Sequence, residues 1–171
     1  DEDSPLEALG NGLRDWRRAL HLFLEQACEL SHRVLIVTTK ESPWVEDCLE
    51  TYAPSVKSLL ERLGGLKVLY AKERVKSKDR CSRRHPGQTK EELKELSTLV
   101  KYAAMKREAA NFYGVEQSWK NILSLGDMHD AITEVSFRRN GPSKENLRTK
   151  SVIMPSLPSL TEISCLLDFS R

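Results

Sequence analysis

The stretch that decides the fold is Arg33-Val34-Leu35-Ile36-Val37-Thr38-Thr39. Four branched apolar residues follow one another without a break, and two hydroxyl side chains come directly after them. A short, uninterrupted apolar run is typical of a parallel strand that is buried on both faces. Open α/β sheets bind their ligands at the carboxyl ends of such strands. We therefore predict a buried strand whose carboxyl end, at Thr38 and Thr39, faces a ligand.

Helical and strand-like patterns alternate on both sides of this strand. The alternation predicts a single α/β domain over residues 1–171, a doubly wound parallel sheet with helices on both faces. The sequence predicts a polar lead-in over residues 1–11, helices over 12–30, 43–53, 55–63, 90–112, 128–135 and 159–169, and further strands over 66–71, 121–125 and 149–154.

Local signals set the expected helix ends. Ser42 is expected to cap a helix that has Pro43 in its first position, and Pro54 to interrupt that helix. Thr89 and Glu92 have the spacing of a capping box. The side chains expected to face inward include Leu13, Trp16, Leu20, Phe23, Leu24 and Ala27, then Trp44, Val45, Cys48, Leu49 and Tyr52, and then Leu93, Leu96, Leu99, Val100, Ala103, Ala104 and Ala110.

The composition is that of a globular chain without a membrane span. Of 171 residues, 39% are apolar and 30% are charged, and the net charge of +2 does not by itself favour nucleic acid. No apolar run is long enough to cross a bilayer, and no signal-peptide pattern is present. Because the chain begins at Asp1, we expect the gene product to start upstream. Trimming or removal of an organelle-targeting segment from an intracellular protein would each explain this start.

The four cysteines, Cys28, Cys48, Cys81 and Cys165, show no CxxC spacing. This scatter argues against a zinc site and against a disulfide framework. We predict that they are reduced, that three of them face the core, and that the compartment is reducing.

Residues 72–89 are predicted to form an exposed basic loop that ends at a Pro-Gly turn. Such a loop is either a solvated insertion or a docking site for an anionic partner: an acidic protein surface, RNA or a membrane surface. Interleaved aromatic residues, which would stack on bases, are absent from it. The residues that would contact an anionic partner are Lys78, Arg80, Arg83 and Arg84.

Three positions could carry chemistry, and each has a plainer structural alternative. Thr38 could bind a phosphate oxygen or simply cap a turn. Asp127 and Asp130 could bind Mg²⁺ through oxygen ligands, or could cap and favour the start of a helix. Lys101 or Lys106 could neutralise phosphate charge, or be an ordinary surface lysine.

Taken in order, these features resemble motifs two, three and four of the haloacid dehalogenase-like (HAD-like) superfamily. The segment from Val34 to Glu46 is similar to the "IVTNA…GWVE" signature of a branch common in protists, and Tyr70-Ala71-Lys72-Glu73-Arg74-Val75 is similar to its "SARxRY" segment. Leu123-Ser124-Leu125-Gly126-Asp127 and Leu147-Arg148-Thr149-Lys150-Ser151-Val152 also fit. The resemblance implies a Rossmannoid fold, phosphate binding by Thr38, Thr39 and Lys101, and a metal site for Mg²⁺ at Asp127 and Asp130.

The sequence departs from the family at its nucleophile. In the family, an apolar strand ends in DxDx[TV], and its first aspartate attacks phosphate to form an aspartyl-phosphate. Asp1-Glu2-Asp3 has the DxD spelling, but no apolar strand precedes it. We therefore expect a degenerate or incomplete HAD-like domain, a non-catalytic binding or structural component of a larger assembly with a protein partner. The alternatives are a Mg²⁺-dependent phosphohydrolase whose motif lies upstream of Asp1, and a nucleic-acid-associated module.

The strand that carries this motif is the central one in the family's sheet. Its absence would leave the edges of two neighbouring strands without hydrogen-bond partners, at a cost in buried backbone groups. The strand could come from upstream residues or from another subunit, or the two neighbours could pair directly with each other. We predict one of the first two, and direct pairing of the strands before Thr38 and Asp127 would refute that prediction.

Overall fold

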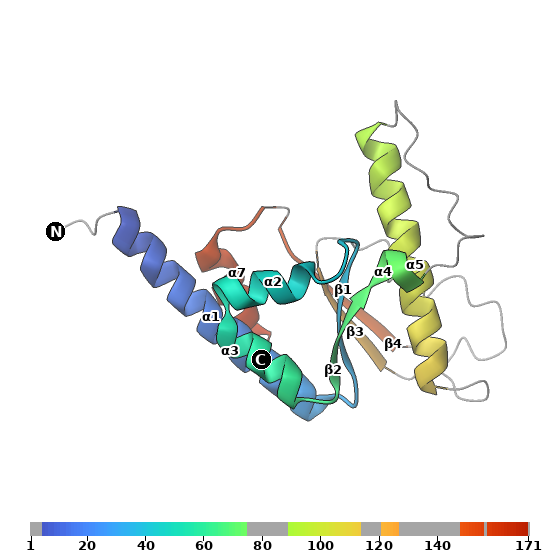
Figure 1. The fold of residues 1–171 in the computed structure, drawn as a ribbon, viewed down its shortest axis with the longest axis horizontal. Helices are drawn as coiled ribbons and strands as arrows, with labels where there is room; N and C mark the ends of the chain where they lie inside the picture. Colours follow the sequence, from blue (N-terminus) through green and yellow to red (C-terminus); the bar gives the residue numbers. More distant parts are fainter. Residues whose placement is uncertain (1–4, 75–88, 114–120, 127–147, 156, 171) are drawn as a thin grey trace. The chain divides into compact units, whose positions relative to one another are not determined.

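The structure is a computed structural model that describes residues 5–74, 89–113, 121–126, 148–155 and 157–170. It is mixed α/β with short parallel strand pairs (Figure 1). Within those ranges, no helix combines the length and the apolar character that a membrane span requires. The helices are α1 (Pro5–Leu30), α2 (Trp44–Tyr52), α3 (Pro54–Arg62), α4 (Ala71–Arg74), α5 (Lys90–Tyr113) and α7 (Leu160–Phe169), and the strands are β1 (Val34–Thr38), β2 (Leu66–Tyr70), β3 (Asn121–Gly126) and β4 (Arg148–Ile153).

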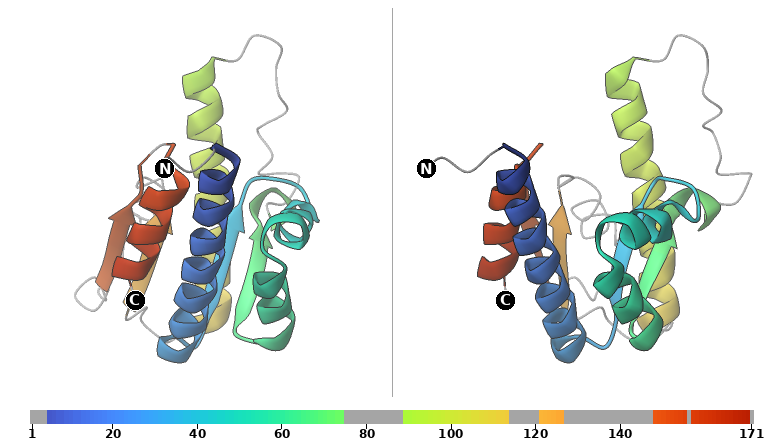
Figure 2. Two further views of the ribbon diagram at one scale, coloured as in Figure 1. Left: turned by 90° about the vertical axis from the view of Figure 1, so that its left-hand side faces the viewer. Right: turned by 60° about the vertical axis from the view of Figure 1, so that its left-hand side comes forward.

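The chain divides into two compact units. The first comprises residues 1–36, 42–68 and 155–171, and the second comprises residues 37–41 and 69–154. In the first unit, α1 packs against α7 and α3. Figure 2 shows α7 lying alongside α1. The buried residues of this unit are Ala19, Leu24, Val45, Leu49, Ala53, Val56, Leu59, Leu66, Ser164 and Leu167.

Helix α1 begins well before the predicted start at residue 12. Residues 5–11, predicted to be part of a polar lead-in, are helical. Pro5 occupies the first position, where proline is tolerated, and Glu7 lies in the first turn, where a carboxylate is favoured. The two glycines at 10 and 12 lower helix propensity but do not break the helix. The predicted start of this helix was therefore wrong, and Leu6 and Leu9, which are three residues apart, lie within it.

The α2–α3 corner follows the sequence signals in part. Pro54 separates the two helices as predicted, but the N-cap of α2 is Pro43 without a side-chain bond, so the prediction of a Ser42 cap is wrong. Trp44 and Tyr52 are 47% and 53% exposed and do not face inward as predicted. They lie at the first and last positions of a nine-residue helix, whose buried stripe is short.

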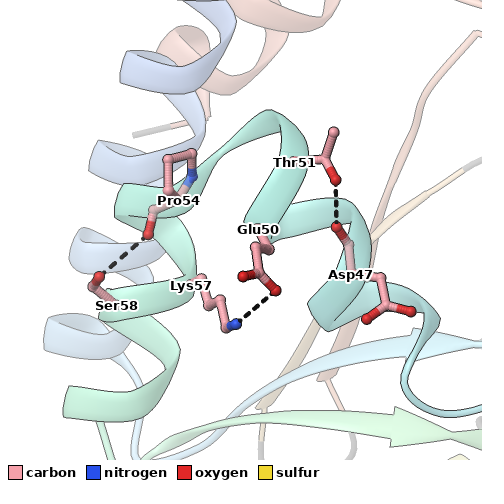
Figure 3. A network of polar contacts seen from close by, with 6 residues as sticks. All are labelled: Asp47, Glu50, Thr51, Pro54, Lys57 and Ser58. Atoms are coloured by element: carbon pink, nitrogen blue, oxygen red, sulfur yellow. Dashed lines mark hydrogen bonds and ion pairs between the residues drawn. The ribbon is translucent and has the colours of Figure 1, made fainter.

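Polar contacts hold this corner together, as Figure 3 shows. Lys57 Nζ lies 3.1 Å from Glu50 Oε2, which links α3 to α2. The Thr51 hydroxyl donates to the carbonyl oxygen of Asp47 at 2.9 Å, within α2. The Lys57–Glu50 contact is a surface ion pair, and both residues belong to the first unit.

In the second unit, α5 begins at the predicted capping box. The Thr89 hydroxyl accepts from the Glu92 N–H at 3.2 Å, and the Glu92 carboxylate accepts from the Thr89 N–H at 2.9 Å, which confirms the prediction. The buried residues of α5 are Thr98 and Ala104. Leu99 is 48% exposed and Ala110 is also exposed, so the predicted inward face is wrong at these two positions.

The strands form two separate pairs, β1 with β2 and β3 with β4. β3 and β4 are parallel, with Asn121 opposite Arg148 and Gly126 opposite Ile153. We predicted a single doubly wound sheet, whereas the described residues form two separate strand pairs. β1 is half-buried along its whole length rather than buried. No backbone ladder joins β1 to β3 in the described ranges.

Two predicted segments differ from, or fall outside, the described structure. Residues 71–74 form the helical turn α4, although residues 72–74 were predicted to belong to the basic loop and Ala71 to a strand. A helix begins here because the Ala-Lys-Glu-Arg sequence has good helix propensity. Residues 75–88 of the predicted loop and the predicted helix at 128–135 lie outside the described residues.

Candidate functional site

The candidate site is the edge where β1 and β2 end. Figure 1 shows the carboxyl ends of β1 and β2 at the same end of this strand pair. Thr38 is the last residue of β1, and Tyr70 is the last residue of β2, directly before α4. Lys72 Nζ lies 3.8 Å from Glu41 Oε1, so an ion pair links the segments that follow the two strands. The carboxyl ends of paired strands thus form one edge, which is where α/β sheets bind ligands.

The Thr38 side chain is half-buried and has a defined orientation. Its hydroxyl oxygen accepts a hydrogen bond from the backbone N–H of Lys40 at 3.1 Å. This local bond is a threonine turn, the structural alternative that the sequence left open. The bond uses the oxygen as an acceptor, so the hydroxyl hydrogen can still donate to a phosphate oxygen. Thr39, the second predicted phosphate ligand, is also half-buried.

The two candidate lysines of α5 lie in different surroundings. Lys101 is half-buried, and Thr98 and Ala104, one turn before it and one turn after it, are both buried. Lys106 is exposed, with its ammonium 5.7 Å from the centre of the Tyr102 ring. Lys101 therefore lies on the partly buried face of α5 and Lys106 on its exposed face, and the choice of Lys101 as the phosphate ligand stays a prediction.

Charged contacts that the sequence reasoning missed attach α4 to α5. Arg74 lies 4.0 Å from the carboxylate of Glu108, whose side chain is only 11% exposed. The guanidinium of Arg107 donates to the backbone carbonyl of Arg74 at 3.0 Å. Lys72 and Glu41 were also missed, because Lys72 was counted in a run of basic residues. Lys72 comes two residues after the end of β2, and Thr38 is the last residue of β1, so a position near a strand's carboxyl end is the signal that could have identified Lys72.

Several predicted site residues lie outside the described residues: Asp127, Asp130, Lys78, Arg80, Arg83 and Arg84. The strand that leads to Asp127 is described up to Gly126, whose carbonyl accepts from the Met154 N–H at 3.0 Å. Within the described ranges, no three or more His, Cys, Asp or Glu side chains are grouped so that they could hold a metal ion. The Mg²⁺ site and the anionic-partner loop remain predictions.

The cysteines in the described residues are free thiols, as expected. Cys28 and Cys48 are half-buried, whereas Cys165 is exposed and does not face the core. Burial raises the pKa of the Cys28 thiol, which keeps it protonated and weakly nucleophilic. None of these thiols belongs to the β1–β2 edge.

No family model matches the chain, and no curated protein or solved structure matches it. The resemblance to the HAD-like superfamily therefore rests on the sequence motifs themselves.

Proposed function

We propose that this chain is a HAD-like α/β domain that binds a phosphate group at the β1–β2 edge without turning it over. In this proposal the domain is a non-catalytic component of a larger assembly and recognises a protein partner. The observation that carries the proposal is the shared edge at which Thr38 ends β1 and Lys72 lies shortly after β2, where Lys72 pairs with Glu41 of the segment that follows β1. Anion recognition needs donors and positive charge at such an edge.

The proposal also includes a HAD-like sheet that is completed by a further strand. In the described residues, β1 pairs with β2 and β3 pairs with β4. β1 is only half-buried, which fits a strand with a neighbour on one edge. In the proposal, the remaining strand comes from upstream residues or from another subunit and completes the doubly wound sheet.

The chemistry of the side chains supports binding rather than turnover. A threonine hydroxyl and lysine ammonium groups can hold a phosphate, but covalent transfer also needs a carboxylate nucleophile. The HAD-like motifs identified in these 171 residues supply Thr38, Lys101 and Asp127, without a strand that ends in DxDx[TV]. If that motif lies upstream of Asp1, the same residues would serve a Mg²⁺-dependent phosphohydrolase. The order of Thr38, Lys101 and Asp127 along the chain, which resembles that of the family motifs, favours this as the second candidate.

The test is a phosphate titration of the 171-residue chain. We expect inorganic phosphate to shift the amide resonances of Thr38, Thr39 and Lys101, and p-nitrophenyl phosphate with Mg²⁺ to remain unhydrolysed. Thr38→Val should abolish the shifts, whereas Thr51→Val, which removes a hydroxyl bonded only within α2, should leave them unchanged. Phosphate-independent spectra would refute the proposed site, and release of p-nitrophenolate would establish the phosphohydrolase instead.

A further inference from the structure

We propose that Lys72 is the main anion-binding cation of this edge and that Glu41 holds it until a phosphate monoester dianion takes its place. This inference rests on the proposed function and names the ligand class and the exchange that admits it. Its geometric basis is the 3.8 Å contact between Lys72 Nζ and Glu41 Oε1, which spans the segments after β1 and β2.

The Lys72–Glu41 pair is suited to exchange because it is weak. The two side chains are 51% and 83% exposed, and the distance lies near the upper limit of an ion pair. Exposed pairs of this kind contribute little and are screened by salt. A phosphate dianion offers twice the charge of a carboxylate and three terminal oxygens, so it can displace Glu41 from the ammonium group.

The other cation of α4 is already engaged in holding the helix in place. Arg74 pairs with the largely buried carboxylate of Glu108, and its backbone carbonyl accepts from Arg107. These contacts fix α4 against α5, as expected from their packing. Lys72 can therefore change partner while the turn that carries it stays anchored.

Thr38 supplies the second half of the recognition. Its oxygen is oriented by the Lys40 N–H, and among the described residues no acceptor takes its hydroxyl hydrogen. Paired strands lie about 4.8 Å apart, so a group at the end of one strand and a group just beyond the end of the next can contact the same tetrahedral anion. An ammonium group and a hydroxyl donor together match a phosphate monoester.

The experiment compares inorganic phosphate binding by variants with opposite expected signs. Lys72→Gln should weaken binding by roughly threefold to tenfold, the range for an exposed charged hydrogen bond. Glu41→Gln should tighten binding by about twofold to threefold, because the resting partner and its repulsive charge are both removed. Lys57→Gln, in the matched Lys57–Glu50 surface pair, should change nothing.

Each other outcome has a distinct meaning. If both Lys72→Gln and Glu41→Gln weaken binding, the ion pair is structural and the exchange is refuted. If Thr38→Val abolishes binding while Lys72→Gln leaves it intact, this inference fails and the proposed function stands. If the unmodified chain does not bind phosphate, the proposed function fails and the inference fails with it. Circular dichroism of each variant verifies that the fold is retained.

Discussion

Replacing Gly12 by alanine should stabilise the first unit through the contact between α1 and α7. A Cβ at this position would meet Cβ and Cδ1 of Leu160 at 3.7 Å each, which is ordinary van der Waals contact. Alanine is better than glycine inside a helix by about 1 kcal/mol. Half-burial of the new methyl group adds about 0.4 kcal/mol, roughly half the value of a fully buried methylene. We expect a gain of about 1.4 kcal/mol, which raises Tm by about 3–6 °C.

Gly10→Ala is the matched control, because nothing lies within 4 Å of a Cβ built there. It should give the propensity gain alone, about 1 kcal/mol. Urea denaturation followed by circular dichroism measures both variants. Repeating Gly12→Ala in a Leu160→Ala background should reduce its gain toward that of Gly10→Ala, because alanine keeps the Cβ of Leu160 and removes the Cδ1 contact. A loss of stability on Gly12→Ala would show that α1 and α7 lie too close for a methyl group, and would refute this description of their packing.

Three further predictions concern single side chains. His21 Nδ1 is, among the described residues, a buried nitrogen without a hydrogen-bond partner, so His21→Leu should raise the free energy of unfolding in urea by about 1 kcal/mol. A lower value would show that the nitrogen is satisfied. Ser159→Ala should lose about 1 kcal/mol of stability with its N-cap bond. Hydrogen bonds from the backbone N–H and the hydroxyl of Ser159 also lower the pKa of the Glu162 carboxyl, and Ser159→Ala removes the hydroxyl bond. Part of the stability loss is therefore present above pH 4.5 and disappears as the pH falls below it. A pH-independent loss would contradict that linkage. Lys101→Gln should weaken phosphate binding by about twofold, less than Lys72→Gln does, whereas Lys106→Gln should not weaken it; equal effects of the two α5 variants in the titration would remove the distinction between the two lysines.

Features encoded by neighbouring residues could be predicted from the sequence. The break at Pro54 and the Thr89–Glu92 capping box depend on interactions within a few residues, and both are present. The inward face of α5 was less predictable. Thr98 is buried and Leu99 is exposed, so the buried side of α5 does not follow the hydrophobicity of its residues alone.

The candidate site could be predicted where a single strand defines it. Thr38 was found because hydroxyls follow an apolar run, and Lys101 was favoured because its flanking residues resemble a family motif. Lys72 and Glu41 are 31 positions apart in the sequence, and only the pairing of β1 with β2 brings them together. Residues that become neighbours through strand pairing require the topology as well as the pattern.

The incomplete burial of β1 leads to a prediction about its second edge. The Val34 N–H donates to the carbonyl of Gly65 at 2.9 Å, so this amide points toward β2. Successive amides of a strand point to opposite sides, so the Ile36 amide also faces β2, whereas those of Leu35 and Val37 face the edge that has no ladder among the described residues.

Hydrogen exchange of the 171-residue chain should therefore be faster at Leu35 and Val37 than at Val34 and Ile36, because only the second pair of amides lies in a ladder. A completing strand, whether from a longer form of the protein or from another subunit, should slow Leu35 and Val37 selectively, since it would bond to them and leave the β2 side unchanged. Equally slow exchange at all four amides in the monomeric 171-residue chain would show that the neighbouring strand is already present within it. The proposal that a central strand must be supplied from outside would then be refuted.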